Sequence, residues 1–231
     1  MAAGAFAPDS YDLDGLVPGA DRAVLLAHGA GADRHAPALR AVAGALTAAG
    51  IPSLRFDYPY RRAGRRAPDR SAVLDATTRA AAALLADRTG LAPERIVLGG
   101  RSMGGRYCSL VVGATDDPVP ALGLLLLGYP LHPAGRPERL RTSHFPRLGC
   151  PCLFVSGTRD SLAGREELTV AAEDITGPVS LHWIESADHG FHPLKRSGRT
   201  ERAVLTEVAE TSVTWATGRL PSSVPAHESS P

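Results

Sequence analysis

The chain has 231 residues and a formal net charge of +1, and 44% of its residues are hydrophobic. These values are typical of a soluble globular protein with one domain, which we expect over residues 1–219. A typical nucleic-acid-binding protein is excluded, because the chain lacks the excess of basic residues that such proteins have. No apolar run is long enough to span a bilayer and no secretion signal opens the chain, so we expect a cytoplasmic protein without a membrane or nucleic-acid partner.

Short apolar runs alternate with longer amphipathic segments along most of the chain. Apolar runs of strand length predict strands, and apolar residues that recur at intervals of three and four predict helices. This alternation is typical of a mostly parallel sheet flanked by helices, and residues 11–17 are a further candidate for an antiparallel edge strand. The predicted strands cover residues 23–27, 52–56, 96–99, 122–127, 152–156 and 180–184, and the predicted helices cover residues 36–49, 68–88, 102–114, 165–174 and 200–216.

Two segments depart from this alternation. Residues 128–149 contain four prolines and can hold only a short helix near Glu138. Because proline interrupts regular helices, we expect no more than a minimal cap there. Residues 220–231 are rich in proline and serine, which predicts a disordered tail.

A G-x-S-x-G pattern lies between one of the predicted strands and the helix that follows it. It reads Gly100-Arg101-Ser102-Met103-Gly104. In a strand-to-helix turn of this kind the serine sits on a strained backbone with its hydroxyl at the edge of the sheet, while the two glycines let strand and helix pass closely. Ser102 is therefore the candidate nucleophile.

A serine hydroxyl needs an imidazole base, and the base needs an orienting carboxylate. Asp160 follows the predicted strand at 152–156, and His189 follows the one at 180–184. The chain order serine, acid, histidine is that of α/β-hydrolases. Ser102, Asp160 and His189 are thus the predicted catalytic residues.

Each of these assignments has an alternative. Asp160 could instead form a local Asx turn, and Asp188 could replace it as the acid. His192 could replace His189 as the base, whereas His182 lies within a strand and is expected to be a packed or edge side chain.

A glycine-rich turn, His28-Gly29-Ala30-Gly31-Ala32, follows the first predicted core strand. Its backbone N–H groups could bind the oxyanion of a tetrahedral intermediate, with Ala30 and Met103 as the two donors. The alternatives are an ordinary strand-to-helix turn or a phosphate-binding loop. Neither of the two nucleotide-binding glycine patterns is present, which disfavours the second alternative.

Several longer motifs resemble a known protein family. They are LLAHGAGAD, LRFDYPYRR, GGRSMGGR, GYPLHPAGRPERLRTSH, GTRD and DHGFHPLKRSGRTE. Residues 22–216 resemble the bacterial α/β-hydrolase family that is related to the testis-expressed hydrolase-like proteins and to a hydrolase-like subunit of a histone acetyltransferase complex. The resemblance implies an α/β-hydrolase fold with little or no lid and places Ser102, Asp160 and His189 at the triad positions. Family members are often likened to dienelactone hydrolases, but those use a cysteine nucleophile where this chain has serine.

Arginines gather in the loops that should surround the mouth of the site, because these loops follow strand ends. We expect Arg62, Arg66 and His132 to contact a carboxylate or phosphate group of the substrate. The alternative is a solvated arginine surface. Single loop histidines such as His132 and His144 are more often surface residues.

The sequence as a whole predicts a serine hydrolase that cleaves an ester or related acyl bond of a small or anionic molecule. The alternatives are a hydrolase-like scaffold that binds partners with little turnover, and an acyltransferase or peptidase with the same triad. No metal or organic cofactor is implied. The three cysteines, Cys108, Cys150 and Cys152, are an odd number with a spacing too tight for zinc, so we expect buried or half-buried thiols.

Overall fold

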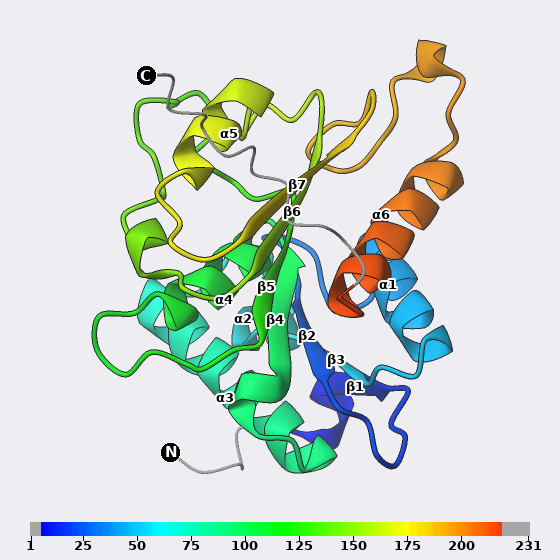
Figure 1. The fold of residues 1–231 in the computed structure, drawn as a ribbon, viewed down its shortest axis with the longest axis vertical. Helices are drawn as coiled ribbons and strands as arrows, with labels where there is room; N and C mark the ends of the chain where they lie inside the picture. The colour runs from blue at the N-terminus through cyan, green and yellow to red at the C-terminus, as the bar shows by residue number, and fades with distance from the viewer. Residues whose placement is uncertain (1–5, 219–231) are drawn as a thin grey trace, which may run out of the picture.

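A computed structural model describes residues 6–218 and contains one seven-stranded sheet in the order β1-β3-β2-β4-β5-β6-β7 (Figure 1). Only β1 is antiparallel to its neighbour, and the other pairs are parallel. All six predicted core strands and the candidate edge strand are confirmed. The predicted tail at 220–231 lies outside the described residues. The strands are β1 (Tyr11–Asp14), β2 (Ala23–Ala27), β3 (Ser53–Phe56), β4 (Ile96–Arg101), β5 (Gly123–Leu127), β6 (Cys152–Gly157) and β7 (Val179–Ile184).

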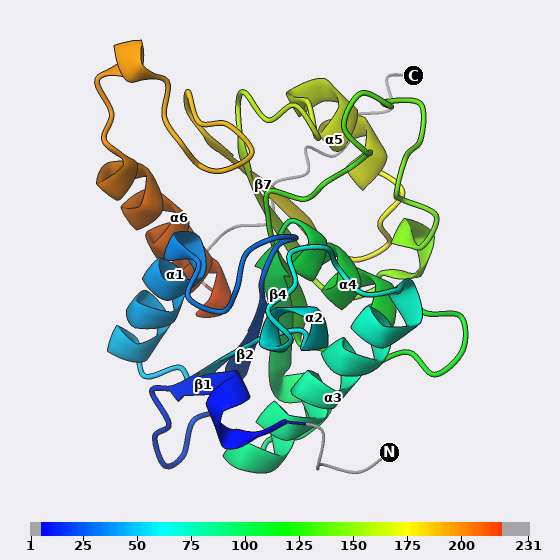
Figure 2. The same ribbon diagram turned by 180° about the vertical axis from the view of Figure 1, so that it is seen from behind.

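Helices cover both faces of the sheet. On one face α1 packs beside α6, and on the other face lie α3, α4 and α5 (Figures 1 and 2). Alternate residues of β2 enter the two cores: Leu25 packs in one, while Val24 and Leu26 pack in the other. Strands that are buried on both faces read as continuous apolar runs, which is why they were visible in the sequence. The helices are α1 (Pro37–Ala48), α2 (Pro59–Arg62), α3 (Ser71–Thr89), α4 (Met103–Val112), α5 (Arg165–Ala172) and α6 (Glu201–Ala216).

The connection between β5 and β6 differs from the prediction. It has turns around Glu138, and its helical segment is a short 3-10 turn at Phe145–Arg147. Burial decides the position of this turn, because the fully buried Phe145 ring packs 5.5 Å from the ring of Tyr129 and 6.1 Å from that of Phe154, measured between centroids. Across residues 6–218, no helix is both long and apolar enough to cross a membrane.

The glycines of the G-x-S-x-G turn touch the neighbouring strand, as expected. A Cβ atom added to Gly104 would lie 2.2 Å from the carbonyl oxygen of Ala27, and one added to Gly100 would lie equally close to the same oxygen at 2.2 Å. Both contacts are with backbone, which cannot swing aside as a side chain can. The close crossing of β2, β4 and the start of α4 therefore requires glycine at both positions.

This close crossing predicts opposite effects for two helical glycines. Gly104→Ala should lower the free energy of unfolding by about 1–3 kcal/mol or more, because the added methyl group overpacks the crossing. Gly44→Ala in α1 is the matched control. An added Cβ there meets nothing within 4 Å, so the better helix propensity of alanine should raise the free energy of unfolding by about 0.5–1 kcal/mol. Denaturant unfolding curves measure both changes, and equal effects at the two positions would contradict the crossing argument.

Candidate active site

Ser102 occupies the sharp turn between β4 and α4. Its backbone has φ 51° and ψ −118°, a conformation that L-residues rarely adopt. The Ser102 N–H donates to the carbonyl oxygen of Leu127 on β5 at 2.9 Å, which fixes the turn against the sheet. The hydroxyl is thereby presented at the carboxyl end of the strands, where ligands bind in open α/β sheets.

Ser102, His189 and Asp160 form a continuous hydrogen-bonded chain. Ser102 Oγ lies 2.9 Å from His189 Nε2, and His189 Nδ1 lies 2.8 Å and 3.0 Å from the two carboxylate oxygens of Asp160. Because the carboxylate only accepts, Nδ1 carries the proton and donates it, which leaves the Nε2 lone pair for the serine hydroxyl. The Asp160 side chain has no exposed surface, whereas that of His189 is 22% exposed. The arrangement can remove a proton from the serine.

The alternative acid and base lie elsewhere. Asp188 Oδ1 accepts the backbone N–H groups of Gly190 at 2.8 Å and His192 at 2.9 Å, so it closes the loop that carries His189. His192 is exposed and contacts Asp188. The Asx-turn alternative for Asp160 also holds in part, because Asp160 Oδ1 accepts the N–H of Leu162 at 2.8 Å as well as the His189 bond.

The two loops that carry the acid and the base are tied to each other and to the serine turn. The Arg159 N–H donates to the Ala187 carbonyl at 2.9 Å, which joins the loop after β6 to the loop after β7. Arg101 donates through Nη2 to the His189 carbonyl at 3.1 Å. Sequence reasoning did not single out Arg101, although it stands directly before Ser102. Its guanidinium holds the histidine backbone against the serine turn.

The glycine-rich loop after β2 lies against the serine. A Cβ added to Gly29 would lie 3.2 Å from Arg101 Nη1 and 3.4 Å from Ser102 Cβ, so the loop packs directly against the serine turn. Ala30, Ser102 and Met103 line one cavity of about 410 Å³. Within the described part of the chain, the N–H groups of Ala30 and Met103 have no hydrogen-bond partner. Both are therefore available to a ligand oxygen.

His28 fixes the orientation of this loop. The ring is fully buried, with Nδ1 2.8 Å from the Gly29 carbonyl oxygen and Nε2 3.2 Å from the Tyr58 nitrogen. Since the Tyr58 N–H can only donate, Nε2 accepts and Nδ1–H donates to Gly29. Burial lowers the pKa of His28, which favours this neutral form. The Gly29–Ala30 peptide is trans, so holding its carbonyl on one side directs the Ala30 N–H to the other.

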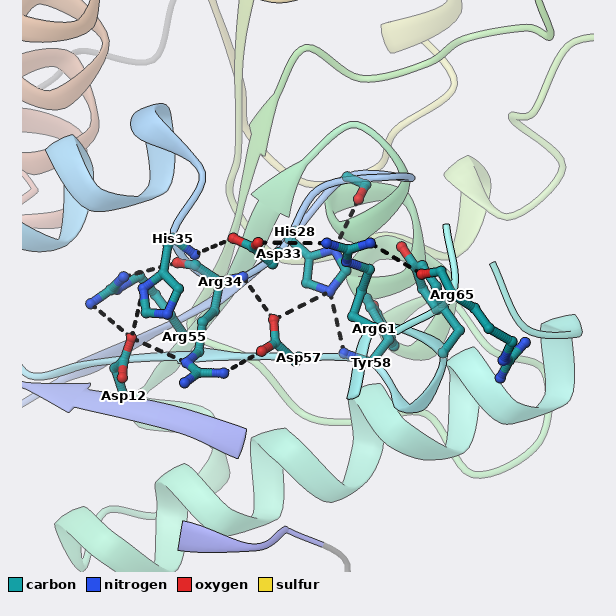
Figure 3. Close-up of polar contacts among 12 residues, drawn as sticks. Asp12, His28, Asp33, Arg34, His35, Arg55, Asp57, Tyr58, Arg61 and Arg65 are labelled. Carbon is teal, nitrogen blue, oxygen red and sulfur yellow. Dashed lines mark hydrogen bonds and ion pairs between the residues drawn. The ribbon is translucent and has the colours of Figure 1, made fainter. Parts of the chain in front are cut away.

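A partly buried ion pair between Arg34 and Asp57 also supports this loop. The Arg34 backbone N–H donates to Asp57 Oδ1 at 2.8 Å, and the Arg34 guanidinium pairs with the second oxygen of the same carboxylate. Figure 3 shows Asp57 between Arg34 and His28, whose Nε2 is 3.9 Å from the carboxylate. Sequence reasoning missed the roles of His28 and Arg34. The only signal was that His28 opens the glycine-rich turn.

The three residues predicted to contact substrate are not among those that line the cavity beside Ser102. Arg62, the last residue of the short helix α2, and Arg66, which follows that helix, are both exposed. His132 is buried, with Nδ1 2.9 Å from the Pro133 carbonyl oxygen and Nε2 3.6 Å from the Glu167 carboxylate. The prediction for His132 assumed that the connection between β5 and β6 faces outward. In the structure this connection folds inward and buries its aromatic residues.

His144, expected at the surface, is also buried. Its Nε2 lies 2.8 Å from Ser109 Oγ, and burial lowers the pKa of His144 to about 4. The cysteine prediction is confirmed: Cys108 and Cys152 are buried, Cys150 is half-buried, and all three are free thiols. Over residues 6–218, no group of three or more histidine, cysteine, aspartate or glutamate side chains is arranged to hold a metal ion.

Two other arginines line the cavity. Arg106 lies on α4, four residues after Ser102, and Arg141 comes from the connection between β5 and β6. The sequence analysis expected positive charge at the mouth, and the arginines that line this cavity are Arg106 and Arg141, not Arg62 and Arg66. The signal for Arg106 was its spacing, since residues four apart on a helix lie on the same side.

Comparison with known proteins gives a family and a fold. Residues 20–217 match the family model described as an alpha/beta hydrolase domain. Dienelactone hydrolase from Anabaena variabilis is 23% identical with a TM-score of 0.65, over 91% of this chain and 92% of that one. An alpha-beta serine hydrolase homologue from Coxiella burnetii is 17% identical with a TM-score of 0.68, over 90% and 93%. A thermophilic esterase from Thermogutta terrifontis is 20% identical with a TM-score of 0.67, over 93% and 91%.

Proposed function

Because the chain belongs to the alpha/beta hydrolase domain family, we propose that it is a serine hydrolase that cleaves an ester or a related acyl bond of a small substrate. The observation that carries this proposal is the unbroken chain of hydrogen bonds from Ser102 through His189 to the buried Asp160. The cavity of about 410 Å³ beside Ser102 suits a small ligand. Residues 1–219 are proposed to form a single catalytic domain. The motifs around the site favour the bacterial branch of the family named above.

The reaction begins with acylation of Ser102. As Ser102 Oγ attacks the carbonyl carbon, His189 Nε2 takes the hydroxyl proton, and Asp160 stabilises the imidazolium that forms. The negative charge on the carbonyl oxygen is met by the N–H groups of Ala30 and Met103. His189 then gives its proton to the leaving group, and the bond between the acyl carbon and that group breaks.

Water completes the cycle by the same route. His189 removes a proton from the attacking water, whose oxygen bonds to the acyl carbon, and the proton passes to Ser102 Oγ as the acyl-enzyme bond breaks. The products are a carboxylic acid and the regenerated serine.

Labelling with a fluorophosphonate, together with hydrolysis of acetate, butyrate and octanoate esters, tests this proposal. Thermogutta terrifontis esterase 2 is known in a butyrate-bound form and in a form phosphonylated by sarin. We expect a single covalent label on the intact protein and faster turnover of the short esters, because the cavity is small. A folded protein that neither labels nor turns over any ester would favour the scaffold alternative.

His28 is proposed as a positioning residue for the oxyanion donor Ala30. His28→Leu removes the bond to the Gly29 carbonyl, and we expect kcat to fall by about 10–100-fold with a much smaller change in KM, since full loss of one donor costs about 10²–10³-fold. His28→Asn can restore a donor to that carbonyl and should recover part of kcat. Steady-state kinetics on a short ester gives the two constants. Equal losses in both variants, matched by a lower thermal midpoint, would indicate a packing role instead.

A further inference from the structure

Arg106 and Arg141 form a pair of positive charges in the cavity that also contains Ser102. Both side chains are half-buried. They come from unrelated parts of the chain, one from α4 and the other from the connection between β5 and β6. The fold therefore brings two like charges to the place where the substrate of the proposed reaction must bind.

Neither arginine has a carboxylate partner among the described residues. Arg106 Nε is buried and has no hydrogen-bond partner, and its guanidinium carbon lies 5.6 Å from the centre of the Tyr107 ring. Asp69 also lines the cavity, but its carboxylate already accepts from the Tyr60 N–H at 2.8 Å and from Arg65 at 2.6 Å. The positive charge of the pair is thus left without compensation by the protein.

The backbone holds both residues in place without a ligand. The Arg106 N–H donates to the Ser102 carbonyl at 3.0 Å, in the first turn of α4. The Arg141 N–H donates to the Leu131 carbonyl at 2.8 Å, and the Tyr129 hydroxyl donates to the Arg141 carbonyl at 2.8 Å. Burial and the nearby charge of Arg106 lower the pKa of Arg141, which agrees with two guanidinium groups that lack an anion. Uncompensated, partly buried charges destabilise a protein unless a ligand balances them.

We propose that Arg106 and Arg141 bind a carboxylate of the substrate while its ester carbonyl reaches Ser102, a proposal that rests on the function given above. Planar guanidinium groups match the two oxygens of a carboxylate. Arg106 starts one helical turn after Ser102 and lines the same cavity, so a short substrate can reach both residues. The substrate class is a short half-ester of a dicarboxylic acid. The exposed Arg62 and Arg66 have no part in this subsite.

Two matched esters test the subsite. Monomethyl glutarate and methyl pentanoate have the same methyl ester and similar length, but only the first carries a carboxylate. The wild-type protein should favour monomethyl glutarate in kcat/KM, measured by proton release. Arg106→Met and Arg141→Met should each lower this preference about ten-fold, and high salt should weaken it in the wild type. Arg139→Met removes one exposed charge from the same connection and should change the preference by less than about two-fold.

A binding measurement separates this proposal from the proposed function. Calorimetric titration of the Ser102→Ala protein with monomethyl glutarate needs no turnover, and its affinity should fall about ten-fold when Arg106→Met or Arg141→Met is added. Binding that depends on the two arginines in a protein that hydrolyses neither ester would support the subsite and reject the hydrolase. Turnover of methyl pentanoate with no carboxylate preference and no arginine-dependent binding would overturn the subsite and leave the hydrolase standing.

The thermal midpoints of the two arginine variants give a second check. Removal of an uncompensated charge should keep or raise the midpoint. A midpoint that falls in both variants, with binding unchanged, also overturns the subsite.

Discussion

Ser102→Ala should abolish covalent labelling by a fluorophosphonate and lower kcat for a short ester by roughly 10⁴–10⁶-fold. The variant loses the only atom that can form the acyl-enzyme, whereas the oxyanion donors and the cavity stay in place. Residual hydrolysis would then come from water activated near His189. Intact-protein mass spectrometry shows the label, and ester hydrolysis under saturating substrate gives kcat.

The chain supplies an instructive control for this experiment. Ser109 also bonds to a histidine, with its Oγ 2.8 Å from His144 Nε2, yet the serine has no exposed surface and lies in the middle of α4. Within residues 6–218 a serine–histidine hydrogen bond therefore occurs twice, at Ser102 and at Ser109. Ser109→Ala should keep the label on Ser102. If labelling persists in Ser102→Ala and disappears in Ser109→Ala, the nucleophile is Ser109 and the assignment of Ser102 is wrong.

His189→Ala should lower kcat by about 10⁴-fold or more, and Asp160→Asn should lower it by about 10⁴-fold, because each breaks the route by which the serine loses its proton. Asparagine keeps the shape of Asp160 but offers its amide N–H group or a neutral oxygen to His189 Nδ1. It cannot stabilise the imidazolium as a carboxylate does. Pre-steady-state release of a chromogenic alcohol reports on acylation directly.

The neighbouring pair Asp188 and His192 provides the controls. Asp188 bonds to backbone N–H groups of its own loop, and His192 is exposed. Asp188→Asn and His192→Ala should therefore reduce acylation by less than about ten-fold, through small shifts of the loop that carries His189. If His192→Ala is inactive while His189→Ala is active, the base is misassigned. A silent Asp160→Asn beside a damaging Asp188→Asn would move the acid in the same way.

Most of the sheet could be predicted because its strands are buried on both faces. Residues 23–27 and 123–127 are apolar throughout, and no other element type accounts for such short runs between helical patterns. The same reasoning predicted that Ser102, Asp160 and His189 lie close together. Each stands at or shortly after the carboxyl end of a strand, and parallel strands bring those ends to one edge of the sheet.

Local patterns failed where burial overrides them. The connection at 128–149 looked polar and proline-rich, so its histidines were expected at the substrate mouth or on the surface, and its helical turn was expected near Glu138. In the structure Phe145, His132 and His144 are all buried. Aromatic packing against Tyr129 and Phe154 draws the segment inward, and sequence spacing carries no information on such long-range contacts.

The sequence by itself determined the order of the strands and helices, the serine turn and the three residues that follow strand ends, because these depend on periodicity, turn chemistry and chain order. Only the tertiary structure placed Asp160 rather than Asp188 within hydrogen-bonding distance of His189, and placed the His28 ring against the glycine-rich loop. It also brought Arg106 and Arg141, rather than Arg62 and Arg66, into the cavity that contains Ser102. Those choices depend on distances between segments far apart in the chain and on which charges are left without a partner. Such distances and pairings arise only when the sheet, helices and loops pack together.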